Sequence, residues 1–419
     1  MEKEVHGLLS GYRVLDLTDE RGLYCGQMLG NLGADVIKVE RPGGDACRRR
    51  GPFFQNEPDP EKSLFWMAFN NCKRGITLNI ESADGKQIFK KLVASADVVL
   101  ESFKPGYMDS IGLGFSELHK VNPQLVFTSV SPYGQSGPYS RYEASDLVCW
   151  GMGGLLYVSG DPDRPPTYVG HIPFSYLMAG MDAASGTAIA LYWRGFSGKG
   201  QQVDVSIQDS VVKTAWMIHE FYCVTGQEFP RSSSKYSVPA SPVELQLVWP
   251  CKDGYVLYFL YTGAFGAEED KRLVRWMEEE GVADEFIKSI DWAKLDWRHK
   301  KREDGEKIMS YIGRLFASRT KAELLQEGYR RDILVQPIAT PKDILEHPQF
   351  RDTGYWQEVF HDDLGVTLKY PSRFCSLSEA PIRVWRRAPR IGEHNLEIYE
   401  GELGMSREEL IALKQAGVI

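Results

Sequence analysis

Short apolar runs alternate with amphipathic segments over the first 130 residues of the chain. The runs at 12–17 and 35–40 have the length of buried strands, and the segment between them, opened by Gly22, has the spacing of an amphipathic helix. The same pattern predicts three further strands and one more helix, at 76–79, 97–100, 125–130 and about 82–94. Strands that alternate with helices predict an α/β fold with a mostly parallel sheet.

Ligands of open α/β sheets bind beyond the carboxyl ends of the strands. We therefore expect the ligand site in the loops that follow Leu17, Glu40, Leu100 and Val130.

The remaining sequence predicts a second domain inserted into the first. Small and apolar residues dominate 175–194, which is typical of a closely packed helix. The polar stretch within 226–237 predicts a linker, and the expected strands and charged helices of 238–335 predict a small α+β domain. We expect 1–225 to form the first part of the large domain and 336–419 to return to it.

Composition and charge narrow the possible functions. The chain has 419 residues and a formal net charge of -8, which argues against nucleic-acid and membrane-surface partners. No run approaches the roughly 20 apolar residues of a membrane span, so we expect a cytoplasmic protein. Seven scattered cysteines without a C-x-x-C pair, and histidines without metal-ligand spacing, predict reduced thiols and no metal.

Four blocks of sequence resemble those of class III CoA-transferases, the carnitine and bile-acid CoA-transferase type. The blocks are 32–45, 70–74, 101–106 with 112–114, and 198–205. The resemblance covers most of the chain and implies a CoA-transferase that uses coenzyme A or acyl-CoA as substrate. It also implies an intertwined ring-like dimer, in which a Rossmann-like large domain is built from both chain ends and a smaller domain lies between them.

The resemblance implies that Arg41, Lys73 and Phe103 contact CoA, because cationic side chains neutralise its phosphates and an apolar ring can flank the adenine. Three further cations lie near these motifs and are weaker candidates, for which a solvated or ion-paired surface charge is the alternative: Arg74, Lys104 and Arg141. The family's pattern is altered at Ser102, where it has asparagine, and at Ser110, where some members have a basic residue.

The aspartate that the family uses as nucleophile is absent. It stands four residues before a glycine, and four residues before Gly180 this chain has Tyr176. A phenol with a pKa near ~10 is protonated at neutral pH and does not replace a carboxylate. We assign no catalytic residue and keep Asp146 and Asp182 as weak candidates, each with a structural role as the alternative.

Two other activities of the resembled family lack their residues here. The histidine position of its racemases matches Ser145, although Asp146 matches the acidic residue beside it. The glycine-rich loop of its formyl transferases is reduced to 261–264.

These observations predict one subunit of a heteromeric CoA-transferase, with a homologous partner chain that supplies the aspartate. Within the family the pattern resembles two-subunit enzymes that move CoA from succinyl-CoA to a carboxylic acid, with benzylsuccinate as a candidate. One alternative is a self-sufficient homodimer that uses a displaced carboxylate: Asp182, Asp146 or Glu143. Another is a non-catalytic acyl-CoA-binding protein.

Overall fold

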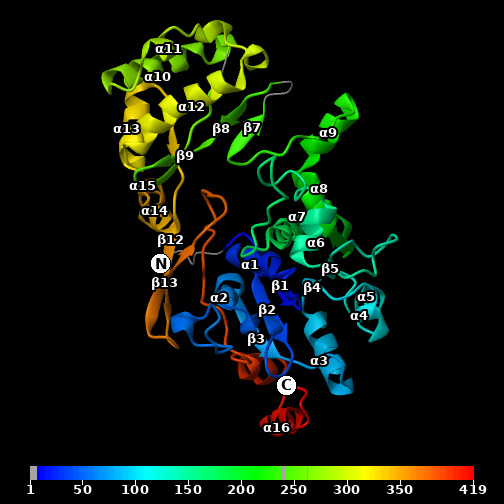
Figure 1. Cartoon of the computed structure of the whole chain (residues 1–419). Helices are drawn as coiled ribbons and strands as arrows, with labels where there is room; N and C mark the ends of the chain where they lie inside the picture. Colours follow the sequence, from blue (N-terminus) through cyan, green and yellow to red (C-terminus); the bar gives the residue numbers. More distant parts are fainter. Residues whose placement is uncertain (1–6, 238–240, 262) are drawn as a thin grey trace. The chain divides into compact units, whose positions relative to one another are not determined.

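The computed structural model describes residues 7–237, 241–261 and 263–419, which divide into two compact units (Figure 1). Unit 1 consists of the described residues up to Gly153, together with Gly170–Ala215 and Pro348–Ile419. Unit 2 consists of Gly154–Val169 and the described part of Trp216–His347.

Unit 2 is larger than the small domain expected at 238–335. Asp161 accepts hydrogen bonds from the backbone nitrogen and the hydroxyl of Ser234, both at 2.8 Å, and Arg231 donates to the carbonyl of Arg164 at 2.7 Å. These bonds tie 154–169 to the segment expected as a linker, so that segment is part of the folded unit.

Unit 1 contains a six-stranded parallel sheet in the order β3-β2-β1-β4-β5-β6. The alternation of apolar runs and helices predicted five of these strands, although β3 begins three residues earlier than expected and β6 was not among the predicted strands. The strands are β1 (Arg13–Asp16), β2 (Asp35–Glu40), β3 (Lys73–Thr77), β4 (Val98–Glu101), β5 (Val126–Ser131) and β6 (Gln202–Ser206).

Helices cover both faces of the sheet (Figure 1). One face packs on α3 (Ala83–Ala94) and α5 (Phe115–Val121), and the other on α1 (Leu23–Asn31) and α7 (Phe174–Ser197). The small residues of α7 let it approach α1 closely, since a Cβ at Gly180 would lie 3.0 Å from the Cβ of Tyr24. The other helices of unit 1 are α2 (Leu64–Asn70), α4 (Tyr107–Ser110), α6 (Asp146–Met152), α8 (Ile207–Thr214), α15 (Pro348–Asp352) and α16 (Arg407–Gln415).

The returning tail of the chain covers the edge strand β3. The antiparallel pair β12 (Trp356–His361) and β13 (Val366–Pro371) precedes this contact. His394 then donates its backbone N–H to the carbonyl of Gly75 at 2.9 Å, and Asn395 accepts from the backbone of Thr77 at 2.9 Å. An uncovered edge strand would present unpaired backbone groups, so the tail completes the sheet.

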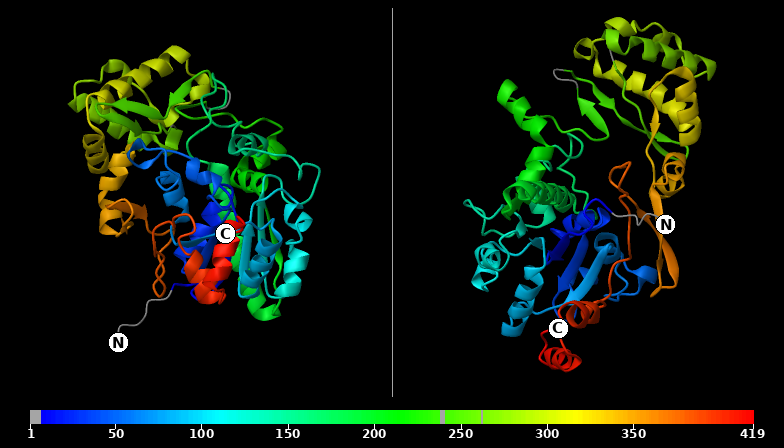
Figure 2. Two further views of the ribbon diagram at one scale, coloured as in Figure 1. Left: turned by 90° about the horizontal axis from the view of Figure 1, so that it is seen from below. Right: turned by 180° about the vertical axis from the view of Figure 1, so that it is seen from behind.

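Unit 2 has its own apolar core around four buried tryptophans, Trp249, Trp276, Trp292 and Trp297. Its strands form the antiparallel sheet β11-β10-β9 and the pair β7-β8, and helix α12 packs against β8 and β9 (Figure 2). The strands are β7 (Lys235–Ser237), β8 (Glu244–Gln246), β9 (Val248–Cys251), β10 (Gly254–Leu257) and β11 (Gln336–Pro337). The helices are α9 (Trp216–Thr225), α10 (Ala267–Glu279), α11 (Glu285–Lys288), α12 (Arg302–Ala317), α13 (Lys321–Arg331) and α14 (Pro341–Glu346).

Candidate functional site

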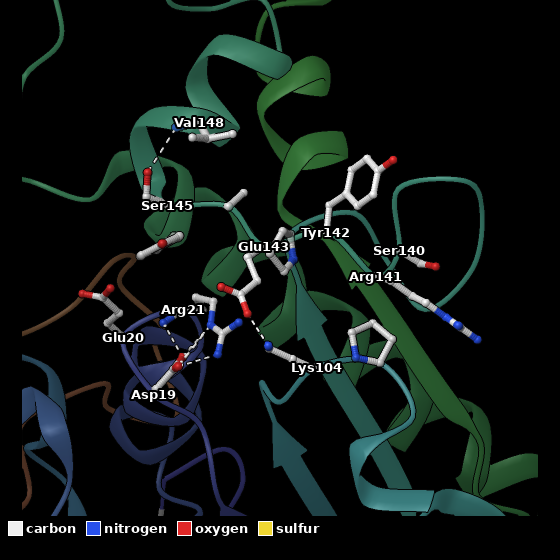
Figure 3. A pocket seen from close by; sticks show the side chains of 14 residues that line it. Asp19, Glu20, Arg21, Lys104, Ser140, Arg141, Tyr142, Glu143, Ser145 and Val148 are labelled. Atoms are coloured by element: carbon white, nitrogen blue, oxygen red, sulfur yellow. Dashed lines mark hydrogen bonds and ion pairs between the residues drawn. The ribbon is translucent and has the colours of Figure 1, made fainter. Parts of the chain in front are cut away.

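A cavity of about 500 Å³ opens in unit 1 where the strand order reverses between β1 and β4. Loops that follow neighbouring strands diverge at such a reversal, which is where open α/β sheets bind ligands. Charged side chains from the loops after β1, β4 and β5 surround the cavity, as Figure 3 shows for ten of the lining residues. The lining residues are Asp19, Glu20, Arg21, Lys104, Pro105, Pro132, Ser140, Arg141, Tyr142, Glu143, Ala144, Ser145, Val148 and Tyr176.

The loop after β1 brings three consecutive charged residues to the cavity. The Arg21 guanidinium donates to both carboxylate oxygens of Asp19, at 2.5–3.1 Å. Ser102, after β4, accepts from the backbone of Asp19 at 2.8 Å and donates to its carboxylate at 2.9 Å. These bonds hold the loops after β1 and β4 together at the mouth of the cavity.

Glu20 is a cavity carboxylate that the motif comparison missed. Its side chain is about 38 % exposed and forms an ion pair with Arg50. Partial burial raises the pKa of Glu20 and outweighs the opposing effect of the Arg50 charge. The only sequence signal for this residue was its position in a loop where ligands were expected, directly after the strand that ends near Leu17.

Tyr176, which the sequence resemblance matches to the family's nucleophile, also lines the cavity and is buried. Burial, with the nearby Glu20 carboxylate, raises the pKa of its hydroxyl well above the usual value, so the phenol is neutral. Neutral phenols are weak nucleophiles. The geometry therefore places a non-nucleophilic side chain at this wall of the cavity.

The weak carboxylate candidates have structural contacts in this unit. Asp146, at the start of α6, accepts hydrogen bonds from the backbone nitrogen of Ser175, at 2.9 Å, and from its hydroxyl. This contact joins α6 to α7. Asp182 is ion-paired with Lys213 of α8, and neither Asp146 nor Asp182 lines the cavity. Glu143 does line it and is paired with Lys104.

Arg41 and Phe103 follow the carboxyl ends of β2 and β4 and are linked indirectly, through Glu81 and Tyr107. The Arg41 guanidinium lies 3.1 Å from Glu81, which accepts a hydrogen bond from the hydroxyl of Tyr107 at 2.5 Å. The ring of Tyr107 in turn lies 4.7 Å from that of Phe103. The Arg41 side chain is 70 % exposed, so it is accessible to an anion. Lys104, the residue after Phe103, and Arg141 both line the cavity.

Lys73 does not lie at the surface with Arg41 and Phe103. The expected contact between its ammonium group and CoA was therefore wrong. Its side chain is fully buried, and its three N–H groups donate to Asp16 at 2.8 Å, to the carbonyl of Leu23 at 3.0 Å and to Asn70 at 3.0 Å. An ammonium has three donors, so none remains for a phosphate.

The expected contact between Arg74 and CoA is also corrected, because Arg74 lies near the amino end of β3, whereas the cavity lies beyond the carboxyl ends of the strands. Its guanidinium binds both oxygens of Asp35, the first residue of β2, at 2.6 and 2.9 Å. The same group lies 2.7 Å from Glu397 and 2.6 Å from Glu402. Three carboxylates at the amino ends of the strands therefore occupy Arg74, away from the cavity.

The sequence was next compared with known proteins. The model of CoA-transferase family III matches residues 9–395. The chain belongs to CoA-transferase family III. It is 36 % identical over 414 residues to the subunit BbsE of succinyl-CoA:(R)-benzylsuccinate CoA-transferase from Thauera aromatica, an alignment that covers 98 % of each chain.

Other members of CoA-transferase family III extend the comparison. The chain is 30 % identical to the beta subunit of succinyl-CoA--L-malate CoA-transferase from Chloroflexus aurantiacus, over 98 % of each chain. A CAIB/BAIF family protein from Brucella suis has the same fold, with a TM-score of 0.82 and 28 % identity over 94 % of this chain and 99 % of that one.

Membership in the family means that CoA thioesters are the substrates, as the resemblance implied. In the part of the chain that the structure describes, no three His, Cys, Asp or Glu side chains are grouped to hold a metal ion. Among the same residues, no helix is both long and apolar enough to cross a membrane.

Proposed function

We propose that this chain is one subunit of a heteromeric CoA-transferase whose homologous partner supplies the catalytic aspartate. The observation that carries the proposal is Tyr176, a buried, neutral side chain at the nucleophile position of the cavity. The named relatives support it, since two of them are subunits of succinyl-CoA-dependent transferases. The donor is succinyl-CoA or a similar acyl-CoA, and the acceptor is a carboxylic acid such as benzylsuccinate.

The chemistry explains why a carboxylate is needed. The enzyme's carboxylate attacks the donor thioester, the C–S bond breaks, and a mixed anhydride and CoA thiolate form. The thiolate then attacks the enzyme-side carbonyl of the anhydride, which releases the donor acid and leaves an enzyme thioester. The acceptor carboxylate then attacks the enzyme thioester, which releases CoA thiolate and forms a second mixed anhydride. The thiolate attacks the acceptor-side carbonyl of this anhydride, which yields the acceptor thioester and the free enzyme carboxylate. A tyrosine ester is a poorer acyl donor than an anhydride, so Tyr176 does not support this reversible cycle.

The remaining parts of the proposal concern binding and assembly. Arg41 and Phe103 are proposed to contact the nucleotide of CoA, because an exposed guanidinium and an aromatic ring follow the carboxyl ends of the strands and are linked through Glu81 and Tyr107. Lys104 and Arg141 are proposed to attract the anionic substrates to the cavity. The two chains are proposed to interlock as ring-like, Rossmann-like subunits in the cytoplasm.

An active-site count tests the missing nucleophile. The chain is expressed alone and together with a homologous family III chain from the same genome, loaded with succinyl-CoA, and treated with hydroxylamine. Mass spectrometry then locates the hydroxamate. We expect no turnover and no label for the chain alone, and one labelled aspartate on the partner in the complex. A label on this chain would contradict the proposal.

Two substitutions of Tyr176 test the same proposal more directly. Tyr176→Asp should place a carboxylate in the cavity and create a hydroxylamine-sensitive label at residue 176. Tyr176→Phe is the matched control, because it removes the hydroxyl without adding a nucleophile and should leave the activity of the complex unchanged. A large loss of activity in Tyr176→Phe would show that the phenol takes part in the reaction.

A second candidate function is a self-sufficient CoA-transferase in which Glu20 is the displaced nucleophile. Glu20 favours it because it lines the same cavity as Tyr176 and because partial burial weakens the solvation of its carboxylate, which raises its pKa. Turnover by the chain alone, abolished in Glu20→Gln and retained in Glu143→Gln, would establish this alternative. Both residues line the cavity, so the pair is matched.

A further inference from the structure

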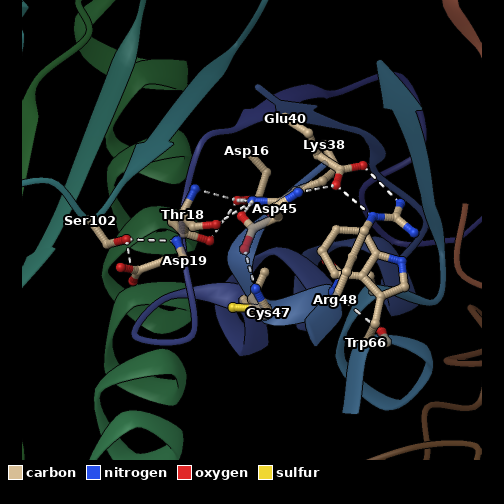
Figure 4. Close-up of polar contacts among 12 residues, drawn as sticks. Asp16, Thr18, Asp19, Lys38, Glu40, Asp45, Cys47, Arg48, Trp66 and Ser102 are labelled. Carbon is tan, nitrogen blue, oxygen red and sulfur yellow. Dashed lines mark hydrogen bonds and ion pairs between the residues drawn. The ribbon is translucent and has the colours of Figure 1, made fainter. Parts of the chain in front are cut away.

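Three charged side chains are fully buried beside the carboxyl end of β1: Asp16 on β1, Lys38 on β2 and Lys73 on β3. Figure 4 shows Asp16 and Lys38 together with Thr18 of the loop that follows β1. Asp16, the last residue of β1, lies between two ammonium groups: Lys73 at 2.8 Å and Lys38 at 3.7 Å. Burial disfavours the charge on Asp16, but the two lysines outweigh this effect and lower its pKa. We call Asp16, Lys38 and Lys73 the buried triad.

The triad is bonded directly to the loop that follows β1, residues 17–22, which reaches the cavity. We call this segment the cavity loop. Asp16 accepts from the backbone nitrogen of Thr18 at 2.9 Å and from its hydroxyl at 2.6 Å. Lys38 donates to the carbonyl of the same residue. All three polar groups of Thr18 are therefore held by the triad, and Asp19, Glu20 and Arg21 follow at once in the sequence.

The triad also reaches the loop after β2, which begins with Arg41. The ammonium of Lys38 lies 3.7 Å from the carboxylate of Asp45, and Asp45 accepts a hydrogen bond from the backbone of Cys47 at 2.8 Å. Beside this contact, Arg48 binds both oxygens of Glu40 and stacks on Trp66 at 3.9 Å (Figure 4).

Helix α1 closes tightly over the triad. Lys73 donates to the carbonyl of Leu23, the first residue of α1, at 3.0 Å. A Cβ added at Gly26 would lie 2.3 Å from a carboxylate oxygen of Asp16, a distance that real Cβ atoms do not adopt. The Asp16 carboxylate therefore has little room to move.

We propose that the buried triad positions the cavity loop, and that Lys73 acts through this loop and not through contact with CoA. The inference rests on the proposed function for its effect on turnover. Buried ion pairs gain little net stability over apolar side chains of similar size, because desolvating the charges is expensive. Their benefit here is geometric, since misplacing a substrate-contacting group by about 1 Å can reduce a rate by about 10²-fold.

The test uses Thr18, the residue that joins the triad to the loop. Thr18→Val keeps the shape of the side chain and removes its hydroxyl, whereas Thr18→Ser keeps the hydroxyl. Thr128→Val is the matched control, because Thr128, on another strand of the sheet, is equally buried and its hydroxyl is hydrogen-bonded to that of Thr187 at 2.7 Å.

Two readouts are measured on the co-expressed complex: hydrogen exchange of peptides covering 17–23, and steady-state kinetics with succinyl-CoA and benzylsuccinate. The amides of Thr18, Asp19, Arg21 and Gly22 are hydrogen-bonded in the structure, so their exchange reports the loop directly. We expect Thr18→Val to speed this exchange and to lower kcat about 10-fold with a smaller change in KM. Thr18→Ser and Thr128→Val should retain wild-type values.

Unchanged exchange at 17–23 in Thr18→Val, or an equal change in Thr128→Val, would overturn the positioning role. A wild-type complex without turnover would instead defeat the proposed function, and the exchange measurement would still decide the role of the triad.

Discussion

Asp16 in unit 1 and Asp270 in unit 2 are both buried aspartates, with exposures of 0 and 1 %. Two lysines and the groups of Thr18 surround Asp16, and its pKa is lowered. Neither carboxylate oxygen of Asp270 has a hydrogen-bond partner among the described residues, and burial raises its pKa to about 8. Equal burial therefore gives opposite charge states.

The difference shows that partners, more than burial, decide whether a buried carboxyl group is ionised. An unpaired charge in the interior is so costly that the group takes up a proton instead. Unit 1 maintains buried charge beneath its cavity, whereas unit 2 holds a neutral acid on α10, a helix whose other buried residues belong to the apolar core. Removing a charged partner of Asp16 should therefore lower the stability of unit 1, whereas replacing Asp270 by a neutral side chain should raise the stability of unit 2.

The largest expected effect is the loss of a cation from the buried triad. Lys73→Met removes the closest charge from Asp16 and should lower the free energy of unfolding by about 3–5 kcal/mol. Urea denaturation followed by circular dichroism measures the change. The double variant Asp16→Asn with Lys73→Met should recover part of the loss, and a single variant as stable as wild type would show that Asp16 does not depend on Lys73.

A smaller effect of opposite sign is expected in unit 2. The pKa of Asp270 is raised above its unfolded value, so its contribution to stability is complete below pH ~4 and is lost as the pH rises towards 8. The loss should approach about 1.4 kcal/mol per pH unit. Asp270→Asn should remove this dependence and stabilise unit 2 by up to about 4 kcal/mol at neutral pH, which is about three pH units above the point of convergence.

Denaturation monitored by tryptophan fluorescence at several pH values tests this, because the core of unit 2 contains Trp249, Trp276 and Trp297. The two proteins should converge near pH 4. Equal slopes in wild type and Asp270→Asn between pH 5 and 8 would contradict a raised pKa.

The smallest effect is expected at the surface pair of Asp182 and Lys213. The Lys213 side chain is 66 % exposed, and exposed pairs contribute about 0–1 kcal/mol. Asp182→Asn should therefore change the unfolding free energy by less than about 1 kcal/mol and leave the activity of the co-expressed complex within about twofold of wild type. A strong loss of activity at normal stability would return Asp182 to the list of candidate nucleophiles.

The sequence predicted the sheet and helix α7 because these elements depend on local patterns of apolar and small residues. It misplaced Lys73 and Arg74 because a motif identifies a cation but not the acceptor at the end of its long side chain. Lys73 reaches Asp16, 57 residues earlier, and Arg74 reaches Glu402, 328 residues later. Such distant pairings have no signature in one sequence.

The cavity residues were only partly predictable. The loop after Leu17 was expected to hold a ligand, but nothing local distinguished Glu20 and Arg21 from solvated charges. The polar segment at 230–235 resembled a linker for the same reason, since its bonds to Asp161 span 73 residues. The local composition of a segment indicates that its side chains are polar, but it does not identify the distant residues to which they bond.

The tail that covers β3 has a consequence for synthesis on the ribosome. Thr77 and its partner Asn395 are 318 residues apart, so at ~5–20 residues per second the edge of the sheet waits roughly 15–60 s for the segment that covers it. During that delay a nascent chain presents an open strand edge beside neighbouring nascent chains. In the proposed heteromer, the homologous tail of the partner would compete for that edge, and translation of both chains from one messenger would bring the competitors together while the edge is still open.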